Sequence, residues 1–328
     1  MRLIFLGTPA FAVPTLEALV EAAHEVAAVL TQPDRPSGRG QNAAASPVKQ
    51  AALRLGLTVY QPERVRRPEA VEYLRGMASD AMVVVGYGQI IPQAAIDLAP
   101  LGIINVHASL LPKYRGAAPI QWAIVRGETR TGVTTMRIDA GLDTGEMLLK
   151  AETEIGPEEN AVELGARLAA MGADLLVETL EGLRTGRIVA EKQDHAQATL
   201  APLLKKEDGA IDWREPAQAI HNRVRGLQPW PGAQTGFRGV PLHVWKTRIL
   251  PLVNENKSAT GGARADQGVR PTVAPGRVLS LKPLVVACGE GVLELLEVQL
   301  EGRKRISAAD FANGQRLTDN DILGATRI

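Results

Sequence analysis

The sequence contains a single cysteine, Cys288, among its 328 residues. Because one cysteine cannot form an internal disulfide, a disulfide-stapled fold is excluded and a reducing, cytoplasmic compartment is expected. No apolar run approaches the length of a membrane span, and the N-terminus lacks the apolar stretch and cleavage site of a signal peptide. We therefore expect a cytoplasmic protein with no membrane partner.

Glycine is sparse where a dinucleotide-binding protein would need it. The turn that follows the first apolar run, residues 7–11, holds only Gly7 of the three glycines in that fingerprint. A dinucleotide-dependent oxidoreductase is therefore disfavoured, and the segment is interpreted as a plain turn from a strand to a helix.

Neither sign of charge is in excess, since the formal net charge is +1. Residues 1–200 hold 19 Lys and Arg against 23 Asp and Glu, whereas residues 201–328 hold 18 against 13. An acidic first part and a basic second part suggest a different partner for each. The length suits two domains, and 45% hydrophobic residues supply ample material for their cores.

Strand-like and helix-like segments alternate along the first part. The apolar, β-branched runs that we expect to form strands are residues 3–6, 26–30, 82–85, 103–106 and 133–138. Helical spacing or a helix-start signal marks residues 11–21, 47–55 and 158–183. Such an alternation predicts an α/β fold, a doubly wound parallel sheet with helices on both faces.

The pattern changes beyond about residue 186. A helix is expected over residues 217–225, and short strands over residues 233–237, 242–249, 276–280, 284–287 and 292–298. Short strands separated by glycine and proline turns predict a small β-barrel or sandwich. Residues 254–274 lack periodicity and are expected to form a loop within this domain.

Three polar side chains follow two of the apolar runs. Asn105 and His107 lie two residues apart at the end of one run, and Asp143 comes shortly after the next. An amide or an imidazolium can stabilise the oxyanion of acyl transfer, and His or a water held by Asp can accept the proton of an attacking amine. A lone His is usually structural, but three suitable groups at strand ends favour a catalytic site. No zinc-ligand spacing or complete calcium loop is present, so no metal is expected.

Other segments allow two interpretations. The loop holding Arg35 and Arg39 could meet an anionic substrate or be a solvated loop. The two glycines around Tyr87 could let a flat ring lie against bare backbone, or could form a simple turn. The basic clusters 205–206 and 303–305, with tryptophans nearby, suit nucleic acid or are ordinary solvated turns.

Taken together, the motifs resemble the methionyl-tRNA formyltransferase family along nearly the whole chain. The residues that carry the resemblance are 5–9, 32–36, 46–49, 105–107, 109–112, 115–121, 139–145, 211–213, 228–231 and 291–296. The resemblance implies a Rossmann-like formyltransferase domain, residues 1–205, followed by an OB-like β-barrel that binds tRNA, residues 206–328. It implies transfer of formyl from 10-formyltetrahydrofolate to the methionine amine of initiator methionyl-tRNA. We expect the enzyme to be a monomer.

The resemblance also implies roles for individual residues. It assigns catalysis to Asn105, His107 and Asp143. It assigns the folate to Ser109, Leu110, Leu111, Pro112, Tyr87, Gln89, Ile90, Ile91 and Asp139. The cations expected to meet the tRNA are Arg35, Arg39, Lys205, Lys206, Arg303, Lys304 and Arg305. Asp139 has a second interpretation, in which it only holds its own loop.

One departure weakens the expected phosphate contacts. After Gly40 the family often carries further lysines, whereas this chain has Gln-Asn-Ala-Ala-Ala at residues 41–45.

Two alternative functions remain. The same formyl-folate site could serve water, a nucleotide sugar or another small amine, or the chain could be a non-catalytic RNA-binding protein.

Overall fold

The computed structural model describes residues 1–37, 42–251 and 273–324. Its contacts divide the chain into two compact units. Unit 1 holds residues 1–120, 130–155 and 163–203, and unit 2 holds residues 121–129, 156–162 and 204–328. The expected boundary after residue 205, with a catalytic first part and a tRNA-binding second part, stays a prediction, because the two units interleave along the chain.

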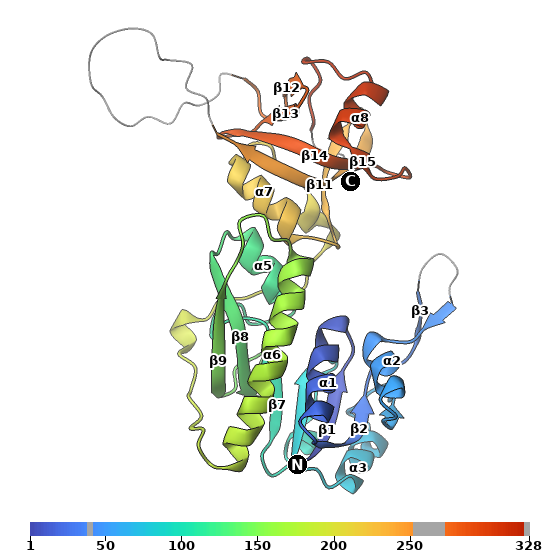
Figure 1. Ribbon diagram of the computed structural model, residues 1–328, viewed down its shortest axis with the longest axis vertical. Coiled ribbons are helices and arrows are strands. Elements are labelled where there is room, and N and C mark those ends of the chain that lie inside the picture. Colours follow the sequence, from blue (N-terminus) through green and yellow to red (C-terminus); the bar gives the residue numbers. More distant parts are fainter. Residues whose placement is uncertain (38–41, 252–272, 325–328) are drawn as a thin grey trace, which may run out of the picture. The chain divides into compact units, whose positions relative to one another are not determined.

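A seven-stranded sheet forms the centre of unit 1, in the order β5-β2-β1-β6-β7-β8-β9 (Figure 1). Five of its strands run parallel: β1 (Arg2–Gly7), β2 (Glu25–Leu30), β5 (Val59–Tyr60), β6 (Ala81–Val85) and β7 (Ile103–His107). The chain builds outward from β1 in both directions, so the sheet has a switch point between β1 and β6. This confirms the predicted doubly wound α/β fold.

The last two strands correct the expectation of a wholly parallel sheet. β8 (Arg130–Arg137) runs antiparallel to β7, and β9 (Met147–Glu154) runs antiparallel to β8. An antiparallel pair needs only a short connection, here residues 138–146, whereas a parallel pair needs a crossover. β9 was not predicted, although the alternating half-buried and exposed positions along Leu149–Glu154 are typical of a strand at a sheet edge.

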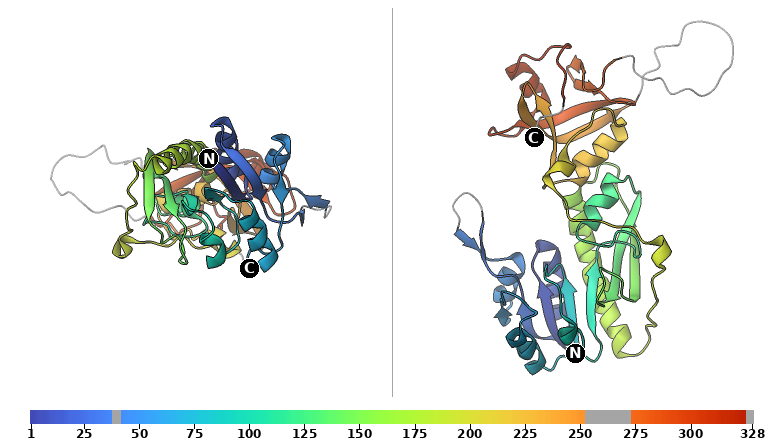
Figure 2. Two further views of the ribbon diagram at one scale, coloured as in Figure 1. Left: turned by 90° about the horizontal axis from the view of Figure 1, so that it is seen from below. Right: turned by 180° about the vertical axis from the view of Figure 1, so that it is seen from behind.

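Helices cover both faces of this sheet. On one face, Leu74 of α3 (Pro68–Gly76) and Ala95 of α4 (Gln93–Ile96) pack in one core with Ile4 and Met82. On the other, α6 (Ala161–Arg184) lies so close to β7 and β8 that a Cβ at Gly172 would meet Val106. Figure 1 shows α6 and α1 (Val13–Glu21) in front of the strands, and Figure 2 gives the reverse view.

The predicted start of α2 (Pro47–Arg54) is confirmed in detail. The Ser46 hydroxyl accepts a hydrogen bond from the Lys49 backbone N–H at 3.0 Å, and Pro47 occupies the first turn. Unit 1 also holds a two-stranded sheet of β3 (Arg35–Ser37) and β4 (Asn42–Ala44), whereas α5 (Pro119–Val125) falls mostly in unit 2. The loop expected at residues 32–46 therefore includes a short pair of strands.

Unit 2 is an antiparallel sheet in the order β10-β11-β14-β13-β12, with β15 added to β14. Its strands are β10 (Ala233–Phe237), β11 (Val240–Leu250), β12 (Val278–Leu281), β13 (Leu284–Ala287), β14 (Val292–Leu300) and β15 (Ile306–Ser307). Residues 321–324 pair with residues 276–278 on one side and with Gly236 of β10 on the other. These backbone hydrogen bonds close the sheet into a ring, which confirms the predicted β-barrel.

Two helices flank the barrel. Ile220 and Val224 of α7 (Ala217–Gly226) share a core with Phe311 of α8 (Ala308–Gly314), and α7 matches the helix expected over residues 217–225 to within one residue. The loop predicted at residues 254–274 lies, except for its last two residues, outside the described part of the chain. None of the helices in the described ranges combines the length and the apolar character needed to cross a membrane.

Candidate active site

Asn105 and His107 lie at the carboxyl end of β7 and point to one face of the sheet. Register pairs Met82 with Ile103 and Val84 with Asn105, so the two polar residues share the face that packs against α3 and α4. Their exposed fractions are 9% and 6%. The sheet thus brings a side-chain amide and an imidazole to one edge, as the two-residue spacing predicts.

Both ring nitrogens of His107 face oxygen atoms. Nε2 lies 2.9 Å from the carbonyl oxygen of Tyr114, and Nδ1 lies 3.7 Å from Oδ2 of Asp143. A carbonyl can only accept, so the first contact places a proton on Nε2. The second separation exceeds the length of a hydrogen bond, which leaves Nδ1 able to exchange a proton with a bound group.

Asp143 reaches His107 by a different route from the one predicted. Because β8 is antiparallel to β7, its carboxyl end at Arg137 pairs with Ile104, away from the carboxyl end of β7. The loop 138–146 returns the carboxylate to the imidazole, where Oδ2 also accepts the backbone N–H of Gly116 at 2.8 Å. The expectation that two strand tips present these groups is therefore wrong for Asp143, although the two side chains do meet.

Asn105 keeps its amide available. Within residues 1–37, 42–251 and 273–324, its side chain forms no hydrogen bond, and its amide atoms are not among the polar atoms that are sealed from solvent without a partner. A ligand oxygen is the partner that would satisfy it.

A cavity of about 740 Å³ opens at the same edge of the sheet. Its walls come from the residues just beyond β1, β2 and β6, including Thr8, Gln32 and Gly86, and also from Arg35. Ligands of doubly wound folds bind in this crevice, at the carboxyl ends of the strands beside the switch point. A neighbouring cavity of about 250 Å³ has Arg35, Arg64 and Arg66 in its lining.

The residues after β6 differ in what they can offer a folate. Tyr87 is 1% exposed within the core, and burial, helped by the nearby Tyr60, raises its pKa. Its ring therefore belongs to the core, whereas Gly86 and Gly88 line the 740 Å³ cavity, and a flat ring lying against their backbone stays a prediction. Gln89 uses its side chain on its own protein, where Oε1 accepts the Val65 N–H at 2.7 Å. Ile90 is 88% exposed and Ile91 is half-buried, and Gln89 and Ile90 line the smaller cavity.

The run of residues 109–112 is mostly internal. Ser109 is fully buried, and its hydroxyl donates to the carbonyl of Lys113 at 2.7 Å. Leu111 packs with Met136 and Met147, and the peptide bond to Pro112 is cis. Leu110 and Pro112 are half-buried, so they are the members of this run with side-chain surface left for a ligand.

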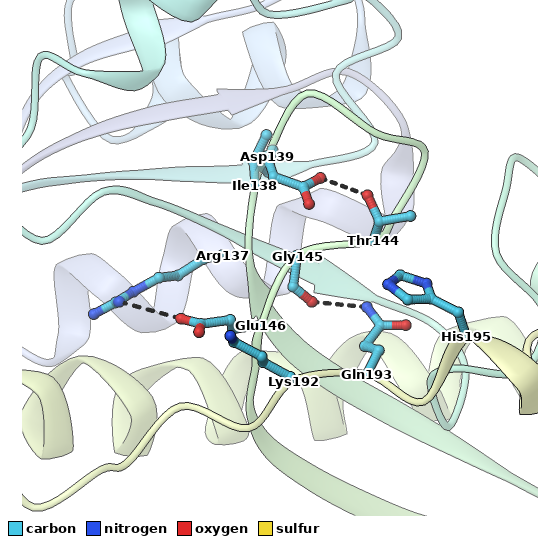
Figure 3. Close-up of a pocket in the computed structure, with 9 residues that line it drawn as sticks. All are labelled: Arg137, Ile138, Asp139, Thr144, Gly145, Glu146, Lys192, Gln193 and His195. Atoms are coloured by element: carbon cyan, nitrogen blue, oxygen red, sulfur yellow. Dashed lines mark hydrogen bonds and ion pairs between the residues drawn. The ribbon is translucent and has the colours of Figure 1, made fainter.

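Asp139 holds its loop, and it also borders a cavity. Its Oδ1 accepts the Gly141 N–H at 3.0 Å and the Thr144 hydroxyl at 2.7 Å. Figure 3 shows the second of these bonds in a cavity of about 490 Å³, whose wall also includes Gln193 and His195. Asp139 therefore holds its own loop at the wall of a cavity, and its contact with the folate stays a prediction.

One of the basic clusters of unit 2 lies beside aromatic rings. Arg305 lies over the ring of Trp245 at 5.3 Å, and Trp245 stacks on His243 with ring centroids 6.0 Å apart. Burial lowers the pKa of His243, and the positive charge of Lys206 lowers it further, against the opposing charge of Glu301. Lys206 therefore lies near this row. Lys205, Arg303 and Lys304 are also exposed. Arg39 lies outside the described residues.

Comparison with known proteins places this chain in a family. A sequence model described as "Formyl transferase" matches residues 1–180, and one described as "Formyl transferase, C-terminal domain" matches residues 203–316. The protein named "Methionyl-tRNA formyltransferase" from Solibacter usitatus (strain Ellin6076) is 75% identical over 324 residues, covering 99% of each chain. The one from Koribacter versatilis (strain Ellin345) is 55% identical, again over 99% of each chain.

The chain belongs to the methionyl-tRNA formyltransferase family. Solved structures share this formyltransferase fold at low sequence identity. HypX from Aquifex aeolicus in complex with tetrahydrofolic acid matches 95% of this chain and 47% of its own, at 15% identity and a TM-score of 0.63. An N-formyltransferase from Helicobacter canadensis, bound to folinic acid and dTDP-3-aminofucose, matches 90% and 98% at 17% identity, with a TM-score of 0.61.

Two further residues of this formyltransferase site were not identified from sequence. Arg115 lies within a motif that carried the resemblance, but no role was assigned to it. Gln193 had no signal, since it lies in an irregular segment far along the chain. Both are buried beside the Asp143 loop. Within the described part of the chain, no cluster of side chains with metal-ligand character is present.

Proposed function

We propose that Asn105, His107 and Asp143 catalyse transfer of a formyl group from 10-formyltetrahydrofolate to the α-amine of methionine on initiator methionyl-tRNA. As a member of its family, the chain is a formyl-transferring enzyme that uses this folate as formyl donor. The observation that carries the assignment of the three residues is the imidazole–carboxylate pair on the same edge as an amide without a partner. We further propose that the enzyme acts in the cytoplasm as a monomer.

The chemistry follows from what each group can donate or accept. The neutral amine attacks the formyl carbon, and the Asn105 amide stabilises the oxyanion that forms. As an imidazolium, His107 adds a second donor at Nδ1, because its Nε2 hydrogen is already donated to the Tyr114 carbonyl. Asp143 accepts the proton that the amine loses, directly or through water. The bond from the formyl carbon to folate N10 then breaks, and N10 takes up the proton that Asp143 accepted, directly or through water, which restores the carboxylate.

The arginines near residues 87–91 support binding of the folate along this segment. The tail of a folate carries carboxylates, and guanidinium groups pair with carboxylates through parallel hydrogen bonds. Arg64 and Arg66 line the smaller cavity together with Gln89 and Ile90. The tail of the folate would lie there, while its formyl group reaches the catalytic edge of β7.

The tRNA position rests on unit 2. Lys206, Trp245 and Arg305 combine positive charge with an aromatic ring. Cationic side chains neutralise the phosphates of RNA, and aromatic rings stack on its bases. The alternation of cation and ring on a β-barrel is typical of nucleic-acid platforms. We assign Lys205, Arg303 and Lys304 to the same surface, and Arg35 to the end of the tRNA that reaches the 740 Å³ cavity.

One assay tests this function against the alternatives. The protein is incubated with 10-formyltetrahydrofolate and either initiator or elongator methionyl-tRNA, and the amino acid is released and analysed for formylmethionine. Formylation of the initiator species is expected. Release of formate with no formylated product would instead indicate water as acceptor. Binding of tRNA without any turnover of the folate would indicate a non-catalytic RNA-binding protein.

A further inference from the structure

The backbone of Asp143 adopts a conformation that a non-glycine residue avoids. Its φ is +49°, in the left-handed region, and such residues persist only where neighbouring groups hold them. The loop around it is also tightly enclosed, because a Cβ at Gly145 would lie 1.9 Å from the Arg137 carbonyl oxygen. Asp143 therefore depends on its surroundings to keep its carboxylate near His107.

Gln193 supplies the main restraint on that loop. Its Nε2 donates to the carbonyl oxygens of Asp143 and Gly145, each at 2.8 Å, and the second bond is drawn in Figure 3. One amide group thus holds the backbone on both sides of Thr144. Gln193 is 6% exposed, so water has little access to compete for these bonds.

Arg115 determines which way the Gln193 amide faces. Its Nε and Nη2 donate to the single Oε1 of Gln193 at 3.0 and 2.7 Å. Because a guanidinium has only donors, the amide oxygen must face Arg115, and the nitrogen must face the two carbonyls. Arg115 is itself 6% exposed and pairs its backbone with residues 199 and 201.

The residue after Arg115 completes the arrangement. The N–H of Gly116 donates to the Asp143 carboxylate, so one short segment restrains the side chain directly and the backbone through Gln193. Within the described ranges, no carboxylate lies at ion-pair distance from the buried Arg115 guanidinium. Nη1 lies 3.1 Å from Nδ1 of His195. A buried cation without a carboxylate partner is costly, so these hydrogen bonds favour a task other than stability.

We propose that Arg115 and Gln193 are positioning residues for the formyl transfer, which place the Asp143 carboxylate beside His107. They touch neither substrate and act through Asp143. The proposal rests on the role assigned above to Asp143, and it predicts that losing either residue lowers kcat while leaving the affinity for folate and tRNA in place.

The first experiment measures kcat and both KM values for Gln193→Met and Gln193→Glu. Met keeps the length of the side chain but forms none of the hydrogen bonds, whereas Glu keeps the contact to Arg115 and turns an acceptor toward the two carbonyls. Both should lower kcat by about 100-fold, the loss expected when a catalytic group moves by about 1 Å. KM for either substrate should change by less than about threefold, since neither substrate contacts Gln193.

Arg115→Lys and Arg115→Met form a graded pair. Lys keeps the charge but cannot make the parallel contacts of Nε and Nη2, so it should retain more kcat than Met and less than the wild type. Arg167→Met is the matched control, because in the same unit it removes guanidinium bonds to Thr153 and Glu154 and leaves the Asp143 loop untouched. It should lower thermal stability and keep kcat.

A double-mutant cycle separates positioning from general support of the fold. In an Asp143→Asn background, Gln193→Met should lower kcat by less than about threefold, because the group it positions has already lost its function. A full additional 100-fold loss there would overturn the proposal. So would an unchanged kcat in Gln193→Met and Gln193→Glu, or a loss confined to KM or to melting temperature. If the wild-type protein itself forms no formylmethionine, the proposed function fails instead, so the two failures are distinct.

Discussion

The unpartnered amide of Asn105 gives the sharpest prediction about catalysis. Replacing it by Ala removes one donor from the oxyanion and no hydrogen bond from the described part of the protein. Loss of a single oxyanion donor typically costs 100- to 1,000-fold in kcat, or about 2.7–4 kcal/mol of transition-state stabilisation. The folded state loses only a few contacts, so the free energy of unfolding should change by less than about 1 kcal/mol.

Asn222 in α7 is the matched control, because it is also buried but its amide oxygen is hydrogen-bonded. Its Oδ1 accepts from Nε and Nη2 of Arg225 at 3.0 and 2.9 Å, and from Gln218 at 3.1 Å. Asn222→Ala leaves a buried guanidinium short of acceptors, which costs about 1–3 kcal/mol of stability or more. At about 2–4 °C per kcal/mol, the melting temperature should fall clearly while kcat stays near normal.

The assay pairs initial rates of formylmethionine formation, at saturating folate and tRNA, with thermal unfolding of the same preparations. The two variants should show opposite effects: Asn105→Ala should lose kcat and keep its melting temperature, whereas Asn222→Ala should keep kcat and lose stability. Near-normal kcat in Asn105→Ala would refute the oxyanion assignment. A large fall in its melting temperature would show that the amide supports the fold and that the inference from its missing partner was wrong.

Three further predictions concern Asp143, the barrel surface and the cysteine. Asp143→Asn should keep its bond to the Gly116 N–H and the folate KM but lower kcat, because an amide cannot accept the amine's proton, and steady-state kinetics checks this. Replacing Arg305 by Ala should raise KM for tRNA without raising KM for the folate. It should also reduce, by about 1, the slope of the logarithm of the tRNA binding constant against the logarithm of salt concentration. An unchanged slope would show that Arg305 does not contact the RNA. Burial raises the pKa of the Cys288 thiol from 9.0 to about 12, so native protein should resist alkylation at pH 8. The unfolded chain ionises first, so this thiol's contribution to stability is complete below pH 9 and falls as pH rises toward 12, which denaturant titrations across that range would detect.

Local patterns in the sequence were sufficient for most of the fold. Apolar runs located β1, β2, β6, β7 and β8, and turn residues bounded the strands of the barrel, with β10 and β13 matching their predicted limits. These features depend on near neighbours, because side-chain alternation and capping act over a few residues. The same alternation placed Asn105 and His107 on one face of β7, since residues two apart in a strand point the same way.

The parts of the site that local patterns did not predict depend on contacts between residues far apart in the sequence. His107 meets Asp143, and Arg115 meets Gln193, 78 positions later in the chain, because β8 turns back along β7 and residues 193–201 return to the site. No local pattern reports strand direction or which irregular segment packs against a loop. The burial of Tyr87 and the row of Trp245 and Arg305 were likewise decided by packing.

The sequence by itself determined which chemical groups this protein possesses and which strands carry two of them, because periodicity is local. Only the tertiary structure decided that an amide without a partner, an imidazole and a carboxylate share one edge. It did so because an antiparallel strand and a strained loop, held by Arg115 and Gln193, bring Asp143 to a place that its position in the chain does not reveal.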